Sequence, residues 1–88
     1  MNVEQLGEDP LRRARSRLRR VEGQVRAVER MLEENADCQQ VLRQIAAAST
    51  ALRRVGVQLA VDGIEQCVRT PGSNEDLEQF QQAFLELS

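Results

Sequence analysis

The chain has 88 residues, a formal net charge of −2, two Cys and no His, Trp or Tyr. This length allows a single domain, and without His the chain lacks both the commonest general base and the commonest imidazole metal ligand. No apolar run approaches the ~20 residues of a membrane span and the N-terminus does not resemble a signal peptide, so we expect a cytoplasmic protein that is not an enzyme.

The first expected helix follows an acidic segment. We expect residues 1–8 to be a flexible tail and residues 9–88 to form one helical domain. Asp9-Pro10 predicts the helix start, because Asp can cap free backbone N–H groups and Pro fits the first turn. Apolar residues then recur at alternating steps of three and four, which is typical of a heptad seam. They are Leu11, Ala14, Leu18, Val21, Val25, Val28 and Leu32.

Arginine residues occupy the outward face of the same helix. Residues 11–30 hold eight Arg and two Glu, a net charge of +6 within a chain whose total is −2. Such a concentrated basic segment indicates an anionic partner, and a merely solvated helix face is the alternative. No aromatic side chain is available there to stack on bases, which disfavours RNA and single strands as partners.

The second expected helix runs from Asp37 to about Arg69, where Thr70-Pro71-Gly72 stops it. Asp37 followed by Gln40 is typical of a capping box at its start. Its apolar residues form more than one row, and a helix that is apolar on more than one side needs more than one neighbour.

Ser73 with Asp76 predicts the start of a third, short helix whose apolar seam contains Phe80 and Phe84. Three helical patterns and no strand pattern predict an all-α fold. The short connection after the first helix implies an antiparallel hairpin. Because so short a chain buries little surface, we expect the three-helix protomer to form an oligomer.

The two cysteines, Cys38 and Cys67, lie near opposite ends of the second helix. Their spacing returns the side chain to within ~20° of the same face but separates the residues by ~43 Å along the axis. A disulfide needs Cα atoms within ~7 Å, so the two cannot meet in one chain. Antiparallel packing of two such helices would place Cys38 opposite the partner's Cys67, twice per dimer. The alternative is that both are buried small hydrophobes.

Several short blocks resemble the signature of the CsoR/RcnR family of bacterial repressors. They are RLRRVEGQVR at 17–26, RMLE at 30–33, Cys38, QIAA at 44–47, Ala51-Leu52 and Cys67-Val68. The resemblance covers roughly residues 11–70. It implies an all-α fold whose protomers form a dimer and further a dimer-of-dimers tetramer. It also implies binding of double-stranded operator DNA without a helix-turn-helix, and release of the DNA by an effector at the second helix.

The residues at the effector positions resemble one subgroup of this family. Copper-sensing members carry a His where this chain has Gly63 and a Tyr where it has Asp37. Nickel and cobalt sensors need several His, and formaldehyde sensors use an N-terminal Pro where this chain has Asn2. The CstR-like subgroup keeps both Cys and lacks the His. The resemblance to this subgroup implies that persulfides or polysulfides link Cys38 and Cys67 across protomers. We expect Gly63 to leave open space beside these cysteines.

The resemblance also implies the DNA-binding residues. Arg17 matches the family's DNA-contacting Arg on the first helix, Arg13 and Arg20 share its face, and Arg53 and Arg54 extend the basic surface from the second helix. The family's next basic residue is replaced here by Val57. Two alternatives stay open: a repressor that binds Cu(I) through Cys38 and Cys67 without another cofactor, and a helical interaction module that does not bind DNA.

Overall fold

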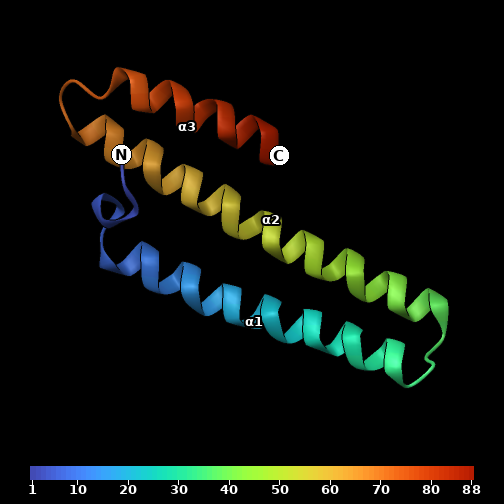
Figure 1. Ribbon diagram of the computed structural model, residues 1–88. Coiled ribbons are helices and arrows are strands. Elements are labelled where there is room, and N and C mark those ends of the chain that lie inside the picture. The colour runs from blue at the N-terminus through green and yellow to red at the C-terminus, as the bar shows by residue number, and fades with distance from the viewer.

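The computed structural model describes residues 1–88 and contains no strand. A short 3-10 helix, η1 (Val3–Leu6), precedes three α-helices, α1 (Glu8–Glu33), α2 (Cys38–Arg69) and α3 (Asn74–Leu87). α1 and α2 form an antiparallel hairpin, and α3 folds back along the C-terminal half of α2 (Figure 1). α2 therefore lies between α1 and α3, which do not contact each other. This confirms the expected all-α, three-helix protomer.

The connection between α1 and α2 has the residues that such a turn needs. Asn35 adopts a positive φ of 57°, a conformation that Asn tolerates better than most residues and that lets the chain reverse. The Asp37 carboxylate accepts hydrogen bonds from the backbone N–H groups of Gln39 (3.1 Å) and Gln40 (3.2 Å). The predicted cap of α2 is therefore confirmed, although the reciprocal bond from the Gln40 side chain is not formed.

The two other predicted helix starts have different outcomes: Asp9 is not the cap of α1, whereas Ser73 is the N-cap residue of α3 but makes no capping hydrogen bond. α1 begins at Glu8 because Gly7, at φ 97°, turns the chain directly from η1 into the helix. Asp9 therefore lies inside the first turn, where its carboxylate pairs with Arg12. The hydroxyl of Ser73 donates to the carbonyl of Thr70 at 2.5 Å and so faces back towards α2, away from the free N–H groups of α3.

Helix α3 docks on α2 at two glycines. Gly56 and Gly63 are one heptad apart on α2, and Leu87 and Phe80 are one heptad apart on α3. A Cβ at Gly56 would lie 2.9 Å from Leu87, and a Cβ at Gly63 would overlap the ring of Phe80. The expectation that Gly63 leaves open space is therefore wrong, because the Phe80 ring fills that space.

The protomer leaves much apolar surface uncovered. It measures 55 × 24 × 13 Å with a radius of gyration of 16.4 Å, where a compact chain of this length would have about 12 Å. Its accessible surface is 6740 Å², against roughly 5200 Å² for a compact monomer of this mass. The half of the hairpin that α3 does not reach exposes Val25, Leu32, Leu42, Ile45 and Leu52.

The N-terminal element η1 contacts both α1 and α2. The expected division into a flexible tail over residues 1–8 and a domain over residues 9–88 stays a prediction. None of the helices has the length and the apolar character that crossing a membrane requires.

Candidate nucleic-acid interface and cysteine positions

The structure gathers the five expected DNA-binding arginines around Arg17. We call them the arginine cluster: Arg13, Arg17, Arg20, Arg53 and Arg54. All five are exposed. Arg17 of α1 lines a groove of about 480 Å³ together with Arg53 and Arg54 of α2. An adjoining groove of about 410 Å³ is lined by Arg17, Arg20 and Arg54, and Arg13 shares a small cavity with Arg17.

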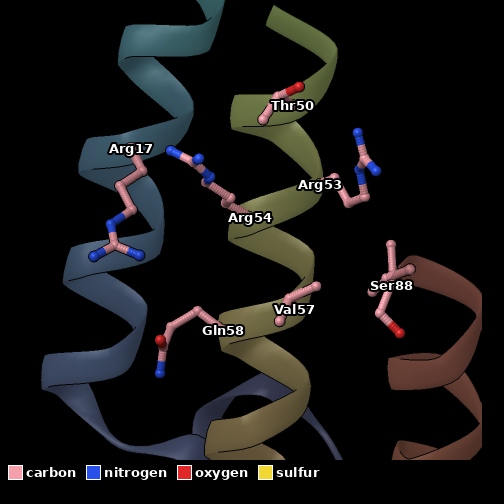
Figure 2. Close-up of a pocket in the computed structure, with 8 residues that line it drawn as sticks. Arg17, Thr50, Arg53, Arg54, Val57, Gln58 and Ser88 are labelled. Atoms are coloured by element: carbon pink, nitrogen blue, oxygen red, sulfur yellow. The ribbon is translucent and has the colours of Figure 1, made fainter. Parts of the chain in front are cut away.

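The close-up shows how the two helices contribute to the larger groove. Arg54 extends from α2 towards α1 and Arg17, whereas Arg53 points away from α1 (Figure 2). Ser88, at the end of α3, lies on the same side of α2 as Arg53 (Figure 2). The positive charge therefore spans the α1–α2 junction and continues around the outer side of α2.

No arginine of the cluster lies within 4.0 Å of an acidic side chain in the structure. The only pairs between Arg and acidic side chains within 4.0 Å join Arg12 to Asp9 and Arg26 to Glu22, both along α1. Guanidinium groups held near one another repel, and an external anion would remove that repulsion. The forked guanidinium matches the geometry of phosphate oxygens, so this surface has the chemistry to hold a phosphate backbone.

Sequence reasoning missed two uncharged polar residues that α2 contributes to the larger groove. Thr50 and Gln58 line it beside Arg54. The three residues stand at successive steps of four on α2, so helical spacing from Arg54 would have found them. A hydroxyl and an amide can both donate hydrogen bonds to phosphate. Val57, at the position where the resemblance implies a basic residue, also lines this groove.

The two cysteines differ in exposure. Cys38 is the first residue of α2 and is exposed, whereas Cys67 is buried with 5% of its surface accessible. α2 is continuous between them, which separates them by ~43 Å and confirms that they cannot meet within one chain. The alternative that both are buried hydrophobes fits Cys67 but not Cys38.

The side chains of one protomer do not form a complete metal site. It has no His, and no group of three or more Cys, Asp or Glu is arranged to hold a metal ion. Position 63 has no side chain and lies beneath the Phe80 ring. Only two thiolates contributed by different protomers would remain as ligands, and these suit a soft ion such as Cu(I).

Comparison with known proteins connects this architecture to a group of regulators. A family model described as metal-sensitive transcriptional repressor matches residues 11–86. The copper-sensing transcriptional repressor RicR of Mycobacterium tuberculosis is 52% identical over 52 residues, which cover 59% of this chain and 54% of RicR. The copper-sensing transcriptional repressor CsoR of Bacillus subtilis is 38% identical over 64 residues, which cover 73% of this chain and 63% of CsoR.

A solved structure shows the same fold. The nickel-responsive transcriptional regulator InrS superposes with a TM-score of 0.67 and 34% identity, covering 88% of this chain and 86% of the InrS chain. The chain spans between about half and two thirds of the length of RicR and CsoR.

Proposed function

This chain belongs to the family of metal-sensitive transcriptional repressors, and from this premise we propose that it is a DNA-binding repressor controlled through Cys38 and Cys67. The observation that carries the DNA-binding part is the arginine cluster, which is exposed, spans two helices and has no acidic partner. The proposal assigns no catalysis to the chain.

The proposed repressor acts as a dimer or a tetramer built on α2. Two protomers whose α2 helices pack antiparallel would bury part of the exposed apolar surface and bring Cys38 opposite the partner's Cys67. The extended shape and the uncovered apolar side chains of the protomer support this assembly. The same pairing explains why one α2 helix carries a cysteine at each end.

The proposed effector is sulfane sulfur, as in a persulfide or polysulfide. The Cys38 thiolate attacks the outer sulfur of a persulfide RSSH, which gives a Cys38 persulfide and releases the thiolate RS⁻. The partner's Cys67 thiolate then attacks the Cys38 sulfur, which forms a disulfide and releases HS⁻. If both cysteines carry a persulfide, they condense to a trisulfide and release H₂S. Exposure of Cys38 supports its role as the first nucleophile.

Cross-linking would reach the arginine cluster through α2. This helix carries Cys38, Arg54 and Cys67 without interruption over its 32 residues. Pinning its ends to a partner would change how α2 lies against α1 and thus the spacing between Arg54 and Arg17. A population shift towards the cross-linked arrangement would then lower DNA affinity.

The proposal is tested by treating the protein in parallel with sulfide, polysulfide, copper and peroxide. Each sample is then analysed by mass spectrometry and by a DNA-binding assay. We expect polysulfide to yield a covalent dimer and to weaken DNA binding, and Cys38→Ala to stay bound and unresponsive. A Cys38→Ala protein that responds like the wild type would refute the thiol mechanism. Wild-type protein without salt-dependent DNA binding would instead support a helical interaction module.

Cu(I) is the second candidate effector, favoured by the relatives RicR and CsoR, which are described as copper-sensing. Two thiolates from different protomers are the only ligands that this chain offers for it. A competition titration with a Cu(I) chelator distinguishes the candidates: a sub-nanomolar site that is lost in Cys38→Ala supports copper, and the absence of such a site excludes it.

A further inference from the structure

A carboxylate lies in the apolar seam between α1 and α2. The heptad positions of α2 that face α1 hold Val41, Ala48 and Val55, all of them buried. The next position in the same series is Asp62, of which only 8% is accessible. Charged residues are rarely buried unless they are paired, so this position needs a physical explanation.

The hydrogen bonding of Asp62 is incomplete. Its Oδ1 accepts a hydrogen bond from Gln58 Nε2 at 3.1 Å. Its Oδ2 is enclosed and has no donor. A buried carboxylate oxygen without a partner is unfavourable, so any donor that can reach it will be drawn towards it.

The cationic side chains that line the cavity beside Asp62 belong to the arginine cluster. Asp62 and Gln58 line a cavity of about 10 Å³ in the seam, together with Arg13 and Arg17 of α1. Both arginines are exposed and neither is paired with an acid. No other cationic residue lines this cavity. A rotamer change of either long side chain is therefore the direct way to satisfy Oδ2.

We propose that Asp62 is an internal counter-ion that competes with DNA phosphate for the guanidinium groups of Arg13 and Arg17. Asp62 is then a positioning residue: it lowers the DNA affinity of the free protein by holding an arginine inward. The competition with DNA rests on the function proposed above, whereas the pairing with an arginine is a property of the chain alone.

The location of Asp62 gives the pairing a regulatory use. Asp62 faces α1, the adjacent Gly63 lies under Phe80 of α3, and Cys67 follows five residues later on the same helix. A shift of this end of α2 that accompanies linkage of Cys67 would move Asp62 relative to Arg13 and Arg17. Asp62 would thereby pair with one of these arginines when the effector acts, and the pair would break when DNA binds.

A double-mutant cycle without DNA tests the pairing. Asp62→Asn keeps the shape and can still accept the bond from Gln58, and Arg17→Gln and Arg13→Gln remove each guanidinium. All variants are compared at one fixed protein concentration. Asp62→Asn changes the unfolding equilibrium constant by some factor in the wild type. We expect this factor to be about three- to tenfold different in the background of one of the two arginine variants. Glu65→Gln removes an exposed charge from the same helix and should show no such coupling.

Fluorescence anisotropy with a mixed-sequence DNA duplex at several salt concentrations tests the competition. We expect Asp62→Asn to bind about three- to tenfold more tightly, with a salt dependence steeper by about one released ion, and Glu65→Gln to keep the wild-type slope. If Asp62→Asn does not fold, Asp62→Ala replaces it, since Ala48 already occupies an equivalent position of the seam.

The outcomes separate this inference from the function on which it rests. Absence of coupling in both cycles, or an unchanged salt slope in a protein that binds DNA, overturns the counter-ion. Absence of salt-dependent DNA binding in the wild type overturns the repressor and with it the competition, while coupling in the cycle would still support the internal pair.

Discussion

Single residues at the α2–α3 contact decide which side chains α2 can carry there. Gly63 occupies the place of the His that copper-sensing members of the family carry, and its lack of a Cβ lets the Phe80 ring lie against the helix backbone. Helix propensity disfavours Gly at such a position by about 1 kcal/mol, so the contact with Phe80 supplies the compensating packing. The same glycine therefore serves α3 docking, and in the proposed function it leaves the two thiols as the groups that meet the effector.

Gly63→Ala tests this contact. The added methyl group would overlap the Phe80 ring, so we expect the free energy of unfolding to fall by about 1–2 kcal/mol, measured by urea denaturation. Gly23→Ala is the matched control, because no atom lies within 4 Å of its Cβ position and higher helix propensity should stabilise it by up to about 1 kcal/mol. Equal stabilisation by both substitutions would mean that Phe80 does not rest on Gly63.

Arg54→Gln tests the arginine cluster at the residue scale. Arg54 points across the α1–α2 junction, so loss of its charge should weaken DNA binding about tenfold and lower the salt slope by about one. Arg30→Gln removes another exposed charge from the last turn of α1, outside these grooves. If both variants lose the same affinity, the binding reflects net charge and not this surface.

At the scale of elements, the sequence predicted the helices well because their ends carry local signals. Asp37 caps α2 and Pro71 follows its end, and the structure places that helix at Cys38–Arg69. Asp9 predicted the right helix but not its cap. Ser73 is the N-cap residue of α3, but its hydroxyl bonds back to Thr70 because the backbone entering the helix decides where the side chain points. Asp62 escaped the sequence analysis because apolar periodicity ignores a charged residue, and only the packed seam shows that it is buried.

Asp37→Ala tests the start of α2. The substitution removes the acceptor for two backbone N–H groups next to Cys38, so we expect a loss of about 1 kcal/mol in unfolding free energy. Hydrogen exchange should rise first at Gln39 and Gln40, whose amides lose their partner. Glu34→Ala, an exposed acid in the same connection, provides the control. If exchange rises equally in both variants, the effect comes from charge and not from the cap.

At the scale of the whole molecule, the separation of the two cysteines makes any bond between them a test of assembly. One protomer is 55 Å long and its α2 helix is continuous, so a Cys38–Cys67 link requires two chains. Exposed apolar side chains lie on the half of the hairpin that α3 leaves uncovered, which agrees with a surface that a second chain would bury.

Mixed isotope labelling tests whether the Cys38–Cys67 bond joins two chains. Equal amounts of ¹⁴N- and ¹⁵N-labelled chains are mixed while unfolded and then refolded together. After polysulfide treatment and digestion, we expect Cys38–Cys67 peptides in light, hybrid and heavy forms at a ratio of about 1:2:1, because random pairing of two chains gives that distribution. Cys67→Ser should abolish this peptide pair. Light and heavy forms without hybrids would mean that the bond forms within one chain, which a continuous α2 forbids, and the antiparallel dimer would then be wrong.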